Sequence, residues 1–146
     1  MKKTTSQSIF IAAALFFTTH AAFAHDQFGA LGKVAGATDY YAISCFDDGN
    51  GAAAYLALQV IDTALPIAAP VVSAQVTKGR WAVNTTDAID GDATYSPKVL
   101  VKGGNGTYYV SVDKTKAGVE NYSFQYHCET SDNQHTGTSI IRMQDQ

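Results

Sequence analysis

The sequence predicts an all-β fold: an antiparallel β-sandwich, jelly-roll or immunoglobulin-like, with about eight strands and one disulfide. Three observations support this prediction. From Thr38 onward apolar and polar residues alternate with a period of two, and no segment of useful length shows the 3.6-residue period of an amphipathic helix. Short pieces rich in glycine, asparagine and aspartate interrupt the alternation at close intervals. Two cysteines, Cys45 and Cys128, stand in alternating segments far apart in the chain.

The first 24 residues are expected to be a signal peptide. Two lysines near the start supply positive charge, residues 9–17 are apolar throughout, and Ala22 and Ala24 place small residues where signal peptidase requires them. The apolar run is too short for a permanent membrane span, which takes about 20 residues. Cleavage after Ala24 would make His25 the first residue and send a bacterial protein to the periplasm or out of the cell.

The charge balance limits the class of partner. Cleavage would remove two lysines and no acidic residue from the 10 basic and 13 acidic residues of the chain, so the formal net charge falls from −3 to −5. An acidic protein is a poor partner for nucleic acid or an anionic membrane, since both attract basic surfaces. No second apolar segment approaches spanning length after cleavage. We therefore expect the partner to be another protein or an extracellular ligand.

The elements follow in order. Residues 25–37 are expected to form an irregular lead-in, because glycine and alanine are frequent there, and residues 38–146 to form the sandwich. Glycine and asparagine between the segments tolerate tight reversals, and the prolines fall at or near strand ends, where a missing N–H costs least. The predicted strands are 39–46, 53–61, 70–77, 80–85, 97–102, 107–113, 121–129 and 136–143.

The alternation also predicts the core, because alternate residues of a strand point to the same side of a sheet. Both cysteines fall on apolar faces, so a buried bridge between two core strands is expected in an oxidising compartment. Closing so long a loop should stabilise the domain by about 4–5 kcal/mol. The four inward-facing rows are Tyr41, Ile43 and Cys45; Leu56, Leu58 and Val60; Tyr108, Val110 and Val112; and Tyr122, Phe124, Tyr126 and Cys128.

Two segments in the second half of the chain carry a family resemblance. The run Gly106-Thr107-Tyr108-Tyr109-Val110-Ser111-Val112, followed ten residues on by Tyr122-Ser123-Phe124, resembles the end of the bacterial pre-peptidase C-terminal domain. In length and strand order the resemblance extends from Asp39 to Cys128, and residues 97–101 stand where that family has an acidic strand. It implies a non-catalytic secreted β-sandwich that here stands alone instead of being appended to a protease.

Three histidines remain after the predicted cleavage: His25, His127 and His135. A free α-amine on His25 would chelate copper(II) together with its own imidazole, and one more imidazole completes a three-nitrogen set suited to tetragonal copper. His127 lies opposite the inward row of its strand and is expected to be exposed, and a hairpin brings His135 near it. The sequence does not decide whether His25 reaches them. Solvated surface histidines with no ligand are the alternative.

Two acidic turns supply the hard oxygen ligands that calcium takes. One turn contains Asp47 and Asp48, and the other contains Asp90 and Asp92. Neither matches the EF-hand loop of about twelve residues, which ends in a glutamate. The alternative is that these aspartates only shape their turns, as aspartate commonly does. Copper is thus the first candidate cofactor of this chain and calcium the second.

Motifs for enzyme chemistry are missing from the sequence. It has no Gly-x-Ser-x-Gly and no His-Glu-x-x-His, and Glu120 and Glu129 show no sign of a glycosidase pair. We therefore expect a non-catalytic exported β-sandwich that binds a partner or ligand through its loops or one sheet face. The alternative is a periplasmic or secreted copper-binding protein that uses His25 with His127 or His135.

Overall fold

The computed structural model describes residues 25–65 and 70–146, so the predicted signal peptide lies outside the described residues. The described chain folds into nine β-strands, and it contains no helix long and apolar enough to cross a membrane. The strands are β1 (His25–Leu31), β2 (Asp39–Phe46), β3 (Tyr55–Asp62), β4 (Val72–Lys78), β5 (Trp81–Thr86), β6 (Val99–Val101), β7 (Gly106–Lys114), β8 (Glu120–Glu129) and β9 (Gly137–Gln144).

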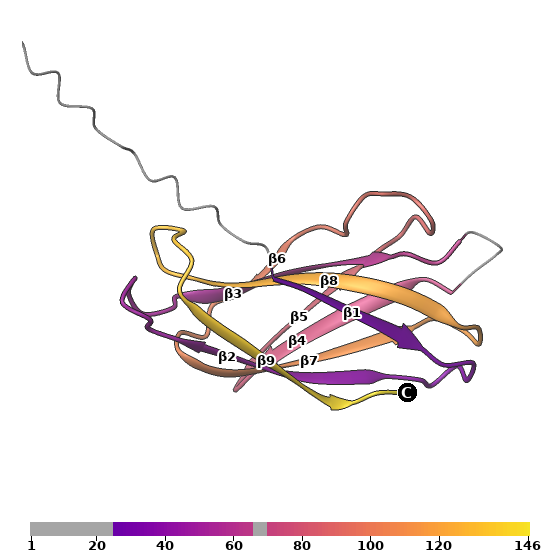
Figure 1. Ribbon diagram of the computed structural model, residues 1–146, viewed down its shortest axis with the longest axis horizontal. Helices are drawn as coiled ribbons and strands as arrows, with labels where there is room; N and C mark the ends of the chain where they lie inside the picture. Colours follow the sequence, from indigo (N-terminus) through magenta and orange to yellow (C-terminus); the bar gives the residue numbers. More distant parts are fainter. Residues whose placement is uncertain (1–24, 66–69) are drawn as a thin grey trace, which may run out of the picture.

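The strands form two antiparallel sheets that lie one over the other (Figure 1). One sheet has the strand order β1-β8-β3-β6, and the other has the order β5-β4-β7-β2-β9. The predicted antiparallel all-β fold is therefore confirmed. The bounds of the eight predicted strands differ from those of β2 to β9 by no more than two residues at either end.

The predicted irregular lead-in of residues 25–37 is wrong for its first half. Residues His25–Leu31 form β1, an edge strand that pairs antiparallel with β8 along its whole length. Gly29 in this strand allows close packing against the neighbouring strand and does not mark an irregular backbone. A Cβ atom on Gly29 would lie 2.3 Å from the ring of Tyr122, so the absent side chain makes room for a core tyrosine of the neighbouring strand.

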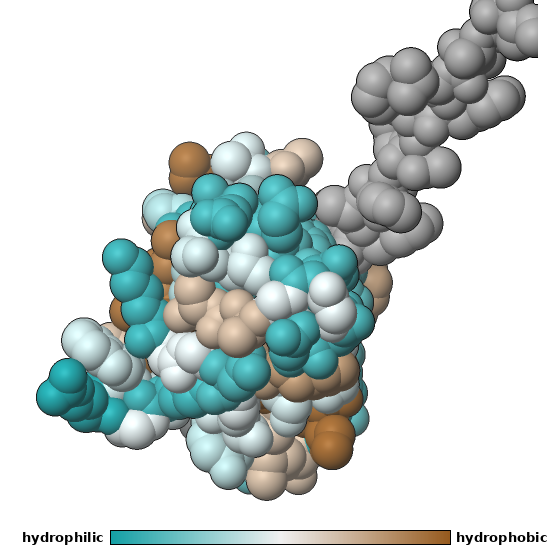
Figure 2. All heavy atoms as spheres, turned by 90° about the vertical axis from the view of Figure 1, so that its left-hand side faces the viewer, coloured by the Kyte–Doolittle hydropathy of each residue, from teal (hydrophilic) through white to brown (hydrophobic). Residues whose placement is uncertain are grey.

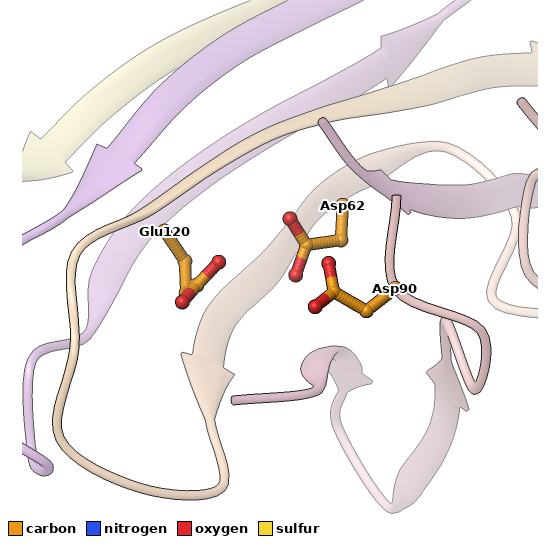
Figure 3. A group of neighbouring side chains, drawn as sticks. All are labelled: Asp62, Asp90 and Glu120. Atoms are coloured by element: carbon orange, nitrogen blue, oxygen red, sulfur yellow. The ribbon is translucent and has the colours of Figure 1, made fainter. Parts of the chain in front are cut away.

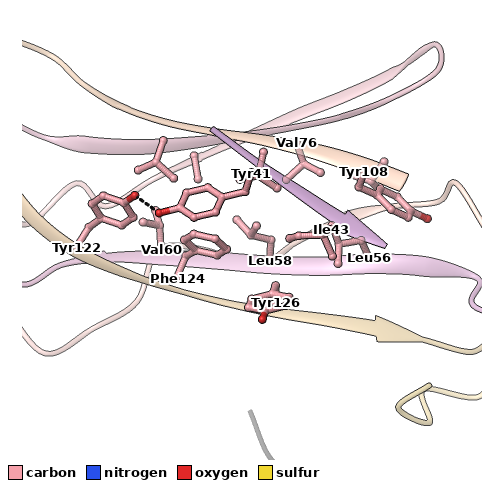
Figure 4. Close-up of a cluster of buried hydrophobic side chains, with 14 of the residues drawn as sticks. Tyr41, Ile43, Leu56, Leu58, Val60, Val76, Tyr108, Tyr122, Phe124 and Tyr126 are labelled. Carbon is pink, nitrogen blue, oxygen red and sulfur yellow. Dashed lines mark hydrogen bonds between the residues drawn. The ribbon is translucent and has the colours of Figure 1, made fainter. Parts of the chain in front are cut away.

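The core lies between the two sheets, where all four predicted inward rows are buried (Figure 4). Tyr41 and Phe124 meet edge to face there, with ring centres 5.0 Å apart, although they come from different sheets. The predicted disulfide is confirmed: Cys45 in β2 and Cys128 in β8 are both buried and bonded. Because β2 and β8 belong to different sheets, the bond ties the two layers of the sandwich together.

A chain of hydrogen bonds crosses one part of this core. The Tyr122 hydroxyl lies 2.6 Å from the Tyr41 hydroxyl and donates to Asp39 Oδ2 at 2.5 Å. The other oxygen of Asp39 accepts from the backbone N–H of Gln146 at 2.8 Å. Burial, and then the hydrogen bond to Asp39, raise the pKa of Tyr122. The Tyr122 phenol therefore stays protonated and can act as a donor to a fully buried carboxylate.

Tyr122→Phe is expected to lower the free energy of unfolding by about 1–3 kcal/mol, because a buried carboxylate loses its hydroxyl donor. Urea unfolding measures this change. Tyr109→Phe is the matched control, since Tyr109 is 40% exposed and an exposed hydroxyl should change the value by no more than about 0.5 kcal/mol. Equal effects of the two substitutions would contradict a structural role for the Tyr122 hydroxyl.

Candidate metal sites

Two clusters of metal-ligating side chains lie at opposite ends of β8. Glu120 opens the strand and belongs to an acidic cluster, whereas His127 lies near its end and belongs to a histidine cluster. The two positions are seven residues apart, a distance of roughly 23 Å at the usual rise of a β-strand. The two clusters are therefore separate sites, and each is described in turn.

The histidine group consists of His25, His127 and His135. It joins the start of β1, the end of β8 and the connection between β8 and β9. The ring centres of His25 and His127 are 6.0 Å apart, and those of His127 and His135 are 4.4 Å apart. The structure thus brings together all three histidines that were singled out in the sequence, including His25, which the sequence alone did not place.

Two features of the fold produce this convergence. The register of β1 sets His25 opposite Tyr126, the residue before His127, and the rings of His25 and Tyr126 lie 5.6 Å apart. On the other side, a β-bridge between Glu129 and His135 folds the connection back over the end of β8. His127 is consequently half-buried between two rings and not exposed as predicted.

The environment of His127 favours its neutral form. Burial first, and then the charge of His135, lower its pKa from 6.5 to about 4, against the opposing charge of Glu129. Its Nδ1 atom is buried and has no hydrogen-bond partner. At neutral pH His127 is therefore an uncharged imidazole with an unused polar nitrogen, which is the form of histidine that binds metals.

The spacing of the rings can be compared with that of metal-bound imidazoles. A ligating nitrogen lies about 2 Å from its ion and about 1.2 Å from its ring centre, so two rings on one ion have centres about 4.5 Å apart at a right angle and about 6.4 Å apart when opposite. The observed 4.4 and 6.0 Å are close to these two values. No choice of one ring nitrogen from each histidine puts all three within 4.8 Å of one another, so a ring must turn before all three face one ion.

The acidic group consists of Asp62, Asp90 and Glu120. Each of them offers a carboxylate oxygen within 4.8 Å of those of the other two, and they are the one such set of three among the described residues. Asp62 ends β3, Glu120 begins β8, and Asp90 lies in the connection between β5 and β6. The three carboxylates point toward one another (Figure 3). Asp62 is fully buried, Glu120 is 3% exposed, and Asp90 is half-buried.

The hydrogen bonds of the acidic group are incomplete. One oxygen of Asp62 accepts from the backbone N–H of Ala64 at 2.9 Å. Asp62 Oδ2, Asp90 Oδ1 and Glu120 Oε2 are all buried and without a hydrogen-bond partner. The pKa of Asp62 is raised to about 6, first by burial and then by the charges of Glu120, Asp90 and Asp87, against the hydrogen bond from Ala64. Burial and the charge of Asp90 also raise the pKa of Glu120.

Three of the four aspartates predicted as calcium ligands, Asp47, Asp48 and Asp92, lie outside this group. Asp47 Oδ1 accepts from the N–H groups of Gly49 and Gly51, Asp48 Oδ1 from Asn50, and Asp92 Oδ1 from Thr94. These side chains stabilise their own turns, which was the alternative left open in the sequence. Asp90 does join an acidic group, but with partners from other strands.

Sequence reasoning missed Asp62 and considered Glu120 only as a catalytic acid. A signal was present, because each extends an inward apolar row by two residues. Asp62 follows Val60 on β3, and Glu120 precedes Tyr122 on β8. An acidic residue in register with a core row must be buried, and a buried acid needs a partner. The predicted inward rows contain only their apolar residues and the cysteines, so they leave out both acids.

Comparison with known protein families, curated proteins and solved structures gives no match to this chain. The resemblance to the pre-peptidase C-terminal domain therefore stays a prediction. Function has to be argued from the two side-chain groups themselves.

Proposed function

We propose that this protein is an exported, non-catalytic β-sandwich that binds copper(II) through His25, His127 and His135. One observation carries the proposal: three histidines from separate segments meet at one end of the four-stranded sheet, with ring centres 6.0 and 4.4 Å apart. Cleavage after Ala24 is part of the proposal, because it would free the α-amine of His25. That amine and the neighbouring imidazole then act as one chelating unit.

The donor set suits copper. Imidazole and amine nitrogens are ligands that copper(II) accepts in its tetragonal geometry, and copper(II) binds such sites more tightly than the other divalent ions of its series. His127 needs no deprotonation at neutral pH, since burial holds its pKa near 4. Copper therefore does not have to displace a proton from this ring.

The surface at the end of the sandwich that carries the histidine group fits a small ligand better than a protein partner. Figure 2 shows this end, and hydrophobic side chains lie scattered there among hydrophilic ones. A large contiguous patch of exposed apolar side chains would mark a protein-docking site. Binding through the loops at this end thus fits a metal ion held by a few polar side chains.

The test is a copper(II) titration of protein that begins at His25, followed by electron paramagnetic resonance and calorimetry. We expect one ion per chain and a tetragonal spectrum with at least three nitrogen donors. His127→Ala should weaken binding by more than about tenfold, since even indirect changes around metal ligands cost about 10–100-fold in affinity. Zinc should bind at least tenfold more weakly than copper.

A four-residue extension before His25 is the matched control for the amine. It keeps all three imidazoles but moves the free amine away from the site, so it should lower the affinity by at least tenfold and reduce the number of nitrogen donors. An affinity and spectrum that neither the extension nor His127→Ala changes would overturn the proposal. Mass spectrometry of the exported protein tests the cleavage itself, and its first residue should be His25.

A further inference from the structure

One end of the sandwich core is closed by charged side chains. Each of the four inward rows ends there in an ionisable residue that lies two positions beyond the last apolar one. All four are buried, with exposed fractions of 0 to 7%. They are Asp39 on β2, Asp62 on β3, Lys114 on β7 and Glu120 on β8, and we call them the charged layer.

Two members of the charged layer have partners. Asp39 accepts hydrogen bonds from the Tyr122 hydroxyl and from the backbone N–H of Gln146. The Lys114 ammonium donates to the backbone carbonyls of Leu31, Gly32 and Gly118. These three carbonyls use the three donors that a lysine side chain offers.

The other two members of the layer do not have enough partners. Asp62 Oδ2 and Glu120 Oε2 are buried with no hydrogen-bond partner, and both side chains are more than nine-tenths buried. Asp90 brings a third carboxylate to the same place, and its buried Oδ1 also has no partner. Burial and the charge of Asp90 keep the pKa of Glu120 raised, although the charges of Lys114 and Lys116 and the side-chain contact with Asp62 lower it. A buried carboxylate oxygen without a partner is costly, and three that converge are costlier still.

We propose that Asp62, Asp90 and Glu120 bind a calcium ion at this end of the core. The donors are all carboxylate oxygens, which are hard ligands and select calcium or magnesium over zinc and copper. Calcium fits better than magnesium, because the donors come from two strands and one loop and calcium accepts irregular geometry with six to eight oxygens at about 2.3–2.6 Å. This inference does not rest on the copper proposal, since the two sites share no residue.

The fold gives this site a structural consequence. Asp87 accepts from the backbone N–H of Asp62 at 2.7 Å and so anchors the start of the connection that carries Asp90. Bound calcium would also link Asp90 to Asp62 and Glu120, and so would hold the β5–β6 connection against β3 and β8. We therefore expect calcium to protect this connection from proteases and to raise the temperature of unfolding.

The experiment is calorimetric titration of the copper-free protein that begins at His25, with calcium chloride at neutral pH. We expect one calcium ion per chain and a rise in the temperature of unfolding. Asp62→Asn should abolish the heat of binding and the thermal shift, and Asp90→Asn should weaken binding by at least tenfold. Asp92→Asn is the matched control, because Asp92 lies in the same connection but uses its carboxylate on Thr94; its affinity should equal that of the wild type.

Several outcomes would overturn the proposal. Wild-type protein that neither binds calcium nor unfolds at a higher temperature with it would show that the carboxylates share protons instead of a cation. Equal calcium affinity of the wild type and Asp62→Asn would place the ion elsewhere. Magnesium binding as tight as calcium binding would refute the choice of metal. Copper binding by the histidine group is unaffected by any of these results, and Asp62→Asn should retain it.

Discussion

Replacing both Cys45 and Cys128 by alanine is expected to lower the free energy of unfolding by roughly 4–5 kcal/mol. The disulfide closes a loop with a sequence separation of 83 residues, and a cross-link across so long a loop removes much of the entropy of the unfolded chain. Small domains have a total stability of about 5–15 kcal/mol. The bond is thus expected to supply a large share of what holds this sandwich folded. Urea unfolding of the variant and the oxidised wild type measures the difference.

Chemical reduction separates the cross-link from side-chain packing. Both cysteines are buried, so alanine also removes two sulfur atoms from the core. Wild-type protein in excess dithiothreitol keeps both sulfurs and loses only the bond. We expect it to lose most of the same free energy as the double alanine variant. A loss below about 1 kcal/mol on reduction would contradict the stabilising role of the bond.

The fold could be predicted from local patterns because most of its strands are amphipathic. Residues such as Val76 and Val112 alternate with polar neighbours, so strand positions and inward rows could be predicted without tertiary information. β1 was not predicted because it is an edge strand in which only the last residue, Leu31, is buried, so it shows no inward apolar row. Gly29 is required there by the ring of Tyr122, a contact that only the paired strands reveal.

The two metal sites differ in how far the sequence could predict them. The histidines could be singled out by their chemistry, but their convergence depends on the register of β1 against β8, which sets His25 opposite Tyr126. The acidic group depends on three separate segments, and Asp62 and Glu120 are far apart in the chain. Turn-forming aspartates such as Asp47 give the stronger local signal, yet they accept hydrogen bonds from the backbone of their own turn.

Without metal, the buried carboxylate of Asp62 is expected to make the folded protein less stable as the pH rises. Folding raises the pKa of Asp62 from 3.8 to about 6, so between these values the folded protein holds a proton that the unfolded chain has released. This contribution to stability is full below about pH 4 and is lost as the pH passes 6. The loss is on the order of 3 kcal/mol. Glu120, whose pKa is also raised, acts in the same direction.

The comparison that isolates this effect is metal-free wild type against Asp62→Asn, since other carboxylates titrate in both proteins. Asparagine stays neutral, so the stability of the variant relative to the wild type should increase between about pH 4 and about pH 7.5 by on the order of 3 kcal/mol. Urea unfolding in a chelator buffer at several pH values measures it. A difference that is flat with pH would show that folding does not raise the pKa of Asp62. With calcium at high pH the wild type should become more stable than Asp62→Asn, because an ion that binds only the folded wild type stabilises it by mass action.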